Sequence, residues 1–289
     1  MERFCIITNR EKDGSMEVTN RIAAFLENRG GKIYLAGEEY RGGGARYTRA
    51  EDIPEDTQCA LVLGGDGTIL QAAHDLAARQ IPIFGINLGT LGFLAETEVA
   101  ELDAALSKLL SGEYTVKEQM MLAVTVHAEG RRSALPDALN DLVVTRSGFS
   151  RVIGAGVYIN GELVSDFRGD GVIVATPTGS TGYSLSAGGP IVAPAAGAMV
   201  ITPVCPHSLN ARSIVVSDLD EVTIKVRQGK KTQEEEAIAT EIYAFLHPPP
   251  PWSVSAHGYP LIWSPASRDS PPQAITPLIL PAFPPHVPQ

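Results

Sequence analysis

Long apolar runs are absent from this sequence of 289 residues: no stretch approaches the 18 residues that identify a membrane-spanning helix. The first residues lead straight into a short apolar segment and lack the basic and apolar regions of a secretory signal. Cysteine is scarce, with three residues and no Cys-x-x-Cys spacing, which argues against a zinc site and indicates reduced thiols. These absences predict a cytoplasmic protein without membrane contact.

An excess of positive charge is also missing. The chain has 23 Lys and Arg residues against 33 Asp and Glu residues, a formal net charge of −10. Because proteins hold nucleic-acid backbones with surplus Lys and Arg, this balance predicts no nucleic-acid partner. Single basic residues can still meet a small phosphate. With 44% hydrophobic residues, the chain is long enough for two domains, each with its own core.

Several nucleotide-binding and hydrolase motifs are missing. No Gly-x-x-x-x-Gly-Lys-[Ser/Thr] loop occurs, and no Gly-x-Gly-x-x-Gly follows the first predicted strand. A P-loop NTPase and a standard dinucleotide-binding dehydrogenase are therefore not indicated. Neither His-Glu-x-x-His nor Gly-x-Ser-x-Gly is present.

Residues 1–112 alternate strand and helix patterns. The predicted strands are residues 4–7, 32–35, 59–63 and 81–86, and the predicted helices lie near residues 18–26, 68–79 and 99–110. The polar stretch 37–56 contains three consecutive glycines and predicts a mobile surface loop without regular structure, near the ligand. The alternation predicts a Rossmann-like parallel α/β domain, in which ligands bind beyond the carboxyl ends of the strands.

Residues 113–246 change to short strand patterns broken by Gly, Asn, Asp and Pro, which predicts a β-rich, sandwich-like domain. The predicted strands are residues 122–126, 142–144, 152–157, 172–175, 213–216 and 222–226. The remaining residues 247–289 hold 13 of the 21 prolines and show neither helical nor strand periodicity. They predict an extended or disordered tail.

One five-residue segment, Gly64-Gly65-Asp66-Gly67-Thr68, lies between a predicted strand and a predicted helix. The backbone N–H groups of its glycines and of Thr68, next to the positive end of a helix dipole, suit a phosphate. Asp66 adds one carboxylate that can serve as a base. The segment predicts a site that handles phosphate groups.

A second segment, residues 176–190, is dense in small hydroxyl residues and glycine and contains one aromatic residue, Tyr183. This composition suits a polar ligand that carries a flat ring. Together, the two segments indicate a nucleotide and a phosphoryl transfer. Taken alone, Tyr183 could equally be a core residue.

Five segments, taken in order, resemble the NAD kinases, and a sixth extends the resemblance over roughly residues 1–238. They are residues 64–68, 87–94, 139–141, 167–171, 176–186 and 202–209. Diacylglycerol kinases and 6-phosphofructokinases carry similar versions of the first segment, whereas residues 176–190 are close to specific. The resemblance implies transfer of the γ-phosphate of ATP, accompanied by Mg²⁺, to the 2′-hydroxyl of the adenosine ribose of NAD. It also implies a homodimer or homotetramer.

The same resemblance assigns residue roles. Asp66 would take the proton from the 2′-hydroxyl, Gly67 would let the backbone approach the nucleotide, and the segment's glycines and Thr68 would hold phosphate. Asn140 and Asp141 would bind ribose hydroxyls. The remaining positions implied to bind NAD are Arg151, Arg168, Asp170, Thr178, Thr181, Gly182, Tyr183, Ser184, Leu185 and Ser186.

The sequence departs from the family pattern after about residue 238. Residues 240–243 replace an expected Asp-Gly-Gln turn, and the Pro-rich stretch follows. A catalytically impaired nucleotide-binding relative therefore remains an alternative. A lipid kinase of the diacylglycerol kinase type is another, although the acidic composition and residues 176–190 argue against it.

Overall fold

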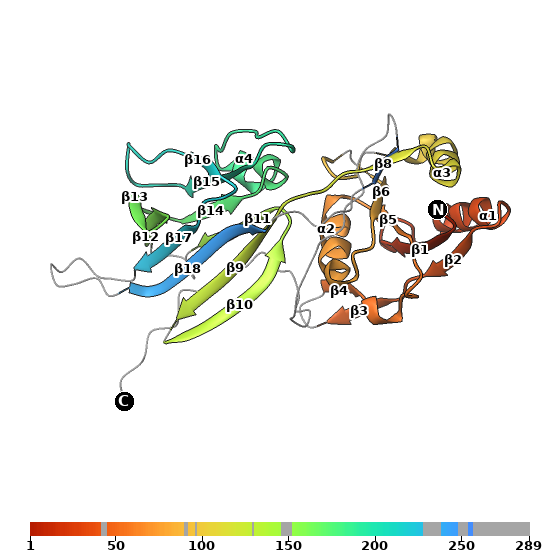
Figure 1. The fold of residues 1–289 in the computed structure, drawn as a ribbon, viewed down its shortest axis with the longest axis horizontal. Helices are drawn as coiled ribbons and strands as arrows, with labels where there is room; N and C mark the ends of the chain where they lie inside the picture. Colours follow the sequence, from red (N-terminus) through yellow and green to blue (C-terminus); the bar gives the residue numbers. More distant parts are fainter. Residues whose placement is uncertain are drawn as a thin grey trace. The chain divides into compact units, whose positions relative to one another are not determined.

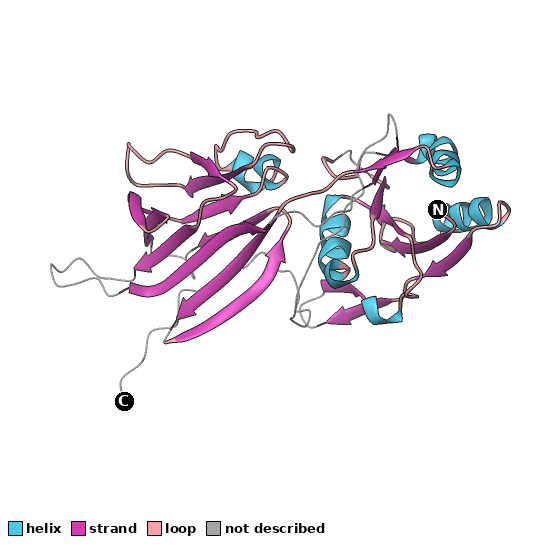
Figure 2. Cartoon of the chain, in the orientation of Figure 1, coloured by secondary structure: helices cyan, strands magenta, loops and turns pink. Residues whose placement is uncertain are grey.

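The computed structural model describes residues 1–41, 45–89, 92–95, 97–128, 130–145, 152–227, 238–247 and 254–256. The chain divides into two compact units. Within the described residues, the α/β unit comprises residues up to 119 together with 254–256, and the β unit comprises residues 120–247. Figure 2 shows the long helices within the α/β unit and the long strands within the β unit.

The α/β unit is built on a five-stranded sheet of order β2-β1-β5-β6-β7 in which all neighbouring strands run parallel. Its strands are β1 Arg3–Thr8, β2 Lys32–Leu35, β5 Cys59–Gly64, β6 Ile83–Asn87 and β7 Thr97–Glu98, and its helices are α1 Glu17–Glu27, α2 Asp66–Asp75 and α3 Leu102–Ser111. The predicted parallel α/β domain is confirmed. Since β2 and β5 lie on opposite sides of β1, the strand order reverses beside β1, and ligands bind at such a point in open α/β sheets.

The burial of these segments explains why their hydrophobic patterns predict strands and helices. Every residue of β5 is buried, as expected for a parallel strand with both faces covered. Helix α1 buries Thr19, Ile22 and Leu26, which are spaced three and four residues apart along one face. Helix α3 follows a single 3₁₀ turn, Val99–Glu101, and ends before Gly112 in the left-handed conformation.

Residues 38–48 contain a hairpin rather than the irregular loop predicted for 37–56. Strands β3 Glu38–Arg41 and β4 Ala45–Thr48 pair antiparallel, and a 3₁₀ turn follows at Ala50–Asp52. The prediction of no regular structure was wrong because the three glycines separate two strand segments. The glycines themselves, residues 42–44, lie outside the described residues. The backbone N–H of Thr48 donates to Oδ2 of Asp75 at 2.7 Å, which attaches the hairpin to α2.

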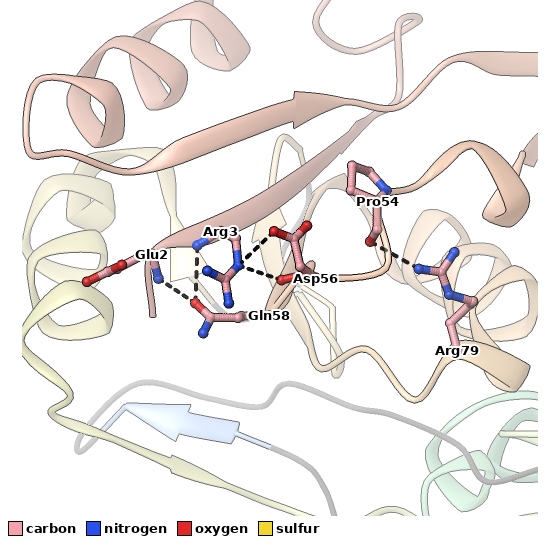
Figure 3. A network of polar contacts seen from close by, with 6 residues as sticks. All are labelled: Glu2, Arg3, Pro54, Asp56, Gln58 and Arg79. Carbon is pink, nitrogen blue, oxygen red and sulfur yellow. Dashed lines mark hydrogen bonds and ion pairs between the residues drawn. The ribbon is translucent and has the colours of Figure 1, made fainter.

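Polar contacts hold the segment that precedes β5 to the start of β1 (Figure 3). Nε of Arg3 donates to the carbonyl of Asp56 at 2.8 Å, and Oε1 of Gln58 accepts the N–H of Arg3 at 3.2 Å. Arg79 donates to the carbonyl of Pro54 at 3.0 Å. These contacts fix one end of β5, whose other end carries the glycine segment.

The β unit consists of two antiparallel sheets, of order β10-β9-β18-β17-β12-β13 and β11-β14-β15-β16. Their strands are β9 Met121–Ala128, β10 Arg131–Ala138, β11 Asp141–Thr145, β12 Ile153–Ile159, β13 Glu162–Gly169, β14 Gly171–Ala175, β15 Ala198–Val204, β16 Ile214–Ser217, β17 Val222–Arg227 and β18 Ile238–His247. Buried apolar residues from both sheets, such as Leu122, Phe167 and Met199, form one core cluster. The predicted β-rich, sandwich-like fold is confirmed.

Strand β18 lies where the sequence leaves the family pattern, yet it occupies the interior of the six-stranded sheet (Figure 1). It pairs with β17 on one side and β9 on the other, so that Thr240 is the register partner of both Val226 and Ala128. The departure after residue 238 therefore leaves no gap in this sheet.

Residues 254–256 fall within the predicted tail but form strand β19 (Val254–Ala256), which pairs antiparallel with β8 (Tyr114–Val116) of the same unit. The other residues from 248 onward lie outside the described residues, so their extended or disordered character stays a prediction. In the described part of the chain, no helix has the length and apolar character needed to cross a bilayer.

Candidate functional site

The glycine segment, residues 64–68, begins with the last residue of β5 and ends in the first turn of α2. Strand β5 ends at Gly64, and α2 begins at Asp66, two residues earlier than predicted. The carbonyl of Gly65 accepts the N–H of Thr68 at 2.9 Å. Because the first N–H groups of a helix have no partners inside it, this connection offers backbone donors to an anion at the carboxyl end of a parallel strand.

Three backbone donors hold the carboxylate of Asp66. The N–H of Phe93 donates to Oδ2 at 2.8 Å, and those of Leu94 and Ala95 donate to Oδ1 at 3.0 and 3.2 Å. A Cβ on Gly92 would overlap this carboxylate. A carboxylate offers about four acceptor positions, so one remains for a further donor such as a hydroxyl.

Asn9 connects the turn after β1 with the glycine segment. Its Nδ2 donates to Oγ1 of Thr68 at 3.2 Å, and its Oδ1 accepts the N–H of Glu11 at 3.0 Å. The backbone N–H of Asn9 also donates to the carbonyl of Leu63, at 2.8 Å. Sequence reasoning missed this residue, whose only signal was its place directly after a buried strand.

In the β unit, the structure brings Asn140 and Asp141 against the loop that follows β14. The carbonyl of Asn140 accepts the N–H of Thr176 at 2.8 Å, and Oγ1 of Thr176 donates to the carbonyl of Leu139 at 2.6 Å. Oγ1 of Thr176 also accepts the N–H of Gly179 at 3.0 Å. A Cβ on Gly179 would overlap the carbonyl of Asn140, so this close approach requires glycine. Thr176 was not predicted as a site residue.

The polar side chains of Asn140 and Asp141 lie close to Gly182. Among the described residues, Oδ1 of Asn140 is buried without a hydrogen-bond partner. Burial raises the pKa of Asp141 to about 6. A Cβ on Gly182 would lie 3.5 Å from Nδ2 of Asn140 and 3.7 Å from Oδ2 of Asp141, so all three residues converge. Buried polar atoms without partners are rare in folded proteins, and a ligand hydroxyl would satisfy Oδ1 of Asn140.

Residues 179–186 form a 3₁₀ turn, Gly179–Thr181, followed by the short helix α4, Tyr183–Ser186. Tyr183 is 48% exposed, which rules out the core alternative and leaves its ring free to stack. Leu185 is also exposed. By contrast, Ser184 is fully buried and its Oγ lies 2.8 Å from Oγ1 of Thr202.

The other predicted NAD-binding residues are spread over the β unit or lie outside the described chain. Arg168, near the end of β13, is exposed, and its carbonyl accepts the N–H of His207 at 2.7 Å. Asp170 is partly buried, in the turn before β14. Oγ1 of Thr181 donates to the carbonyl of Thr178 at 3.1 Å. Arg151 lies outside the described residues.

The described residues contain no group of three or more His, Cys, Asp and Glu side chains arranged to hold a metal ion. The three cysteines are free, as predicted for reduced thiols: Cys5 and Cys59 are buried and Cys205 is exposed. Burial raises the pKa of the Cys5 thiol to about 12, so it stays protonated at neutral pH.

A parallel sheet with a glycine segment at its carboxyl edge, and a β sandwich with a hydroxyl-rich loop, fit the class of nucleotide-binding phosphotransferases. The family model of the ATP-NAD kinase N-terminal domain matches residues 4–114, and that of the ATP-NAD kinase C-terminal domain matches residues 139–241. The chain belongs to the NAD kinase family and catalyses the phosphorylation of NAD to NADP.

Curated relatives agree over most of the chain. The NAD kinase of Lachnoclostridium phytofermentans is 56% identical over 242 residues, which are 83% of this chain and 84% of the relative. The NAD kinase of Lachnospira eligens is 41% identical over 234 residues, 80% of each chain. The lipid-kinase and impaired-relative alternatives gain no support from these comparisons.

Two solved structures share the fold. Yeast NADH kinase complexed with NADH superposes with a TM-score of 0.71 at 24% identity, covering 86% of this chain and 81% of that chain. An NAD kinase from Archaeoglobus fulgidus in complex with ATP gives a TM-score of 0.69 at 25% identity, covering 88% of this chain and 93% of that chain. The first likeness shows the fold alone.

Proposed function

We propose that Asp66 is the general base of the reaction. It accepts the proton of the 2′-hydroxyl of the NAD adenosine ribose while that oxygen attacks the γ-phosphorus of ATP and ADP leaves. The observation that carries this proposal is the carboxylate at the carboxyl end of β5, held by three backbone donors with one acceptor position remaining. A fixed carboxylate needs no reorganisation before proton transfer.

ATP is the donor, in keeping with the ATP complex of the Archaeoglobus fulgidus relative. Gly64, Gly65 and Gly67 hold its phosphates through backbone N–H groups, and Thr68 holds them through its hydroxyl. Mg²⁺ enters as part of the substrate, on the phosphate oxygens of ATP. The described residues therefore need to supply the phosphate cradle and not a complete metal site.

NAD binds through the residues of the β unit that the resemblance implied, and Gly67 lets the backbone approach it. Asn140 and Asp141 take the ribose hydroxyls, which supply the hydrogen bonds that Oδ1 of Asn140 lacks. Tyr183 stacks on a ring of the nucleotide, as its exposed side chain allows. The other proposed contacts are Arg151, Arg168, Asp170, Thr178, Thr181, Gly182, Ser184, Leu185 and Ser186. A homodimer or homotetramer is proposed from the family resemblance.

Asp66→Asn tests the base. The variant removes the proton acceptor, and its remaining oxygen can still accept the N–H groups of Leu94 and Ala95. The hydrogen bond from the N–H of Phe93 lies at the surface, so water can replace the lost carboxylate oxygen as its acceptor. We expect turnover to fall by about 10²- to 10⁴-fold with the NAD dissociation constant changed less than threefold. The matched control is Asp103→Asn, an exposed carboxylate on α3.

The assays are a coupled measurement of NADP formation and calorimetric titration with NAD. Near wild-type turnover in purified Asp66→Asn contradicts the base assignment. A collapse of NAD affinity with an unchanged melting temperature would instead make Asp66 a binding residue.

A further inference from the structure

Lys12 lies over two glycines that belong to different loops of the α/β unit. A Cβ placed on Gly65 would lie 3.0 Å from Nζ of Lys12, and so would a Cβ placed on Gly89. Gly65 precedes α2, and Gly89 follows β6, whereas Lys12 comes from the turn after β1. The ammonium group therefore occupies space beside the carboxyl ends of β1, β5 and β6, where side chains at either glycine would stand.

The backbone beneath Lys12 is fixed. The carbonyl of Asn9 accepts the N–H groups of Lys12 and Asp13, both at 3.0 Å. The carboxylate of Asp13 accepts the N–H of Thr19 at 2.9 Å and its Oγ1 at 2.7 Å, which ties the turn to the start of α1. Because Asn9 also donates to Thr68, the turn keeps its position relative to the glycine segment.

The charge of Lys12 is not neutralised by the described part of the chain. No ion pair joins Lys12 to a described carboxylate, although the chain carries a net charge of −10. Its side chain is exposed, so the ammonium group can meet a ligand from solvent. A lysine is a compact point charge with three donors, which suits the phosphate oxygens of a nucleotide.

We propose that Lys12 binds the β- and γ-phosphate oxygens of ATP. The inference rests on ATP as the phosphoryl donor. During transfer, the bond between the γ-phosphorus and the β–γ bridging oxygen breaks while a bond to the 2′-oxygen of NAD forms, and ADP leaves with the bridging oxygen. Lys12 offsets the negative charge on these oxygens, the task that the lysine of a P-loop performs in other folds. This chain has no such loop, and Lys12 supplies the charge from another strand end.

ATP is favoured over the pyrophosphate of NAD because the ammonium group lies beside Gly65, within the segment that opens α2. The two polyphosphates share one chemistry, so the experiment measures them separately.

The test compares Lys12→Met, which keeps length and removes charge, with Lys12→Arg and with the exposed control Lys32→Met. We expect Lys12→Met to raise the KM for ATP about 10- to 100-fold, as loss of a charged hydrogen bond does, with the KM for NAD changed less than threefold. Lys12→Arg should recover most of the loss, and Lys32→Met should behave as wild type. Calorimetry with magnesium tripolyphosphate should show weaker binding to Lys12→Met, whereas AMP should bind both chains alike.

Three outcomes overturn the proposal. A KM for ATP within twofold of wild type makes Lys12 a solvated surface charge. Selective weakening of NAD binding assigns Lys12 to the NAD pyrophosphate. An equal rise in the KM for ATP in Lys32→Met shows that the effect comes from the net charge of the protein. Wild-type turnover with ATP is measured first, because its absence would refute ATP as the donor whatever the variants do.

Discussion

Gly92 and Asp66 are packed so closely that a Cβ on the glycine would overlap both carboxylate oxygens. The next three residues donate the N–H groups that hold this carboxylate. Gly92→Ala must therefore displace Asp66 or the donors around it. We expect turnover to fall by about 10²-fold, because a misplacement of about 1 Å is enough to cost that much.

The control for this variant is Gly37→Ala, since a Cβ on Gly37 would meet no atom of the described residues within 4 Å. Steady-state assays of both variants, with melting curves to exclude unfolding, decide the question. Turnover of Gly92→Ala within twofold of wild type would mean that the loop yields without moving the carboxylate.

Asp141 predicts a pH dependence of NAD binding. Burial raises its pKa from 3.8 to about 6, so folding favours the neutral carboxyl group. The stability from this group is complete below about pH 4 and is lost as the pH rises through about 6. Ribose hydroxyls donate to the carboxylate, so NAD affinity should rise between pH 5 and 7.

Titrations with NAD across this pH range measure the effect. In Asp141→Asn, the affinity should become nearly independent of pH, and the melting temperature above pH 6 should exceed that of wild type. The surface variant Asp103→Asn serves as the control. A wild-type affinity that stays constant from pH 5 to 7 would show that the ionised carboxylate does not bind NAD.

Much of the fold was predictable because buried residues produce regular hydrophobic patterns in the sequence of strands and helices. Strand β5 is apolar throughout and α1 repeats its buried residues every three or four positions, so both appeared near their observed bounds. Two edge strands of the β unit, β10 and β13, lack this signal and were not predicted. Strand β13 buries only Phe167 and Gly169, and β10 contains Pro136 and two arginines, since each pairs with a neighbour on one side only.

The candidate site divides in the same way. Residues 64–68 stand out because glycines and a carboxylate are contiguous there, whereas the roles of residues 140–141 were implied by the family resemblance, and both assignments stay predictions. Asn9 and Thr176 were not predicted, because their roles depend on partners 59 and 36 positions away in sequence. Lys12 was not predicted as a site residue for the same reason. Its neighbours Gly65 and Gly89 lie near it only in the folded chain, where the parallel strands end together.

Thr176 positions the turn that carries Asn140 and Asp141. Its buried hydroxyl group donates to the carbonyl of Leu139 and accepts the N–H of Gly179. Thr176→Val keeps the shape and leaves both groups unpaired, which costs about 1–3 kcal/mol of unfolding free energy. We expect the KM for NAD to rise about tenfold with the KM for ATP unchanged, and Thr176→Ser to restore both stability and KM.

The exposed variant Thr115→Val on β8 is the control for Thr176. A loss of stability with no change in the KM for NAD would leave Thr176 with a structural role only. An equal rise in the KM for ATP would point to general loosening of the fold.

The last prediction concerns the end of the chain and compares three truncated chains, which end at residues 237, 248 and 258. A chain of residues 1–237 lacks β18 and leaves β9 and β17 without the strand between them, so we expect it not to fold. A chain of residues 1–248 keeps β18 and, among the described residues, loses β19 with its pairing to β8 and its contacts with α3. A chain of residues 1–258 keeps both.

We expect the 1–258 chain to melt with the full chain, because the Pro-rich remainder offsets little of its own conformational entropy. The 1–248 chain should melt a few degrees lower, since a few backbone hydrogen bonds contribute about 0.5–1.5 kcal/mol each. Circular dichroism melts and limited proteolysis of the full chain make the comparison. Protection of the remainder from protease, or a 1–258 chain that melts several degrees early, would show that the Pro-rich stretch packs against the fold.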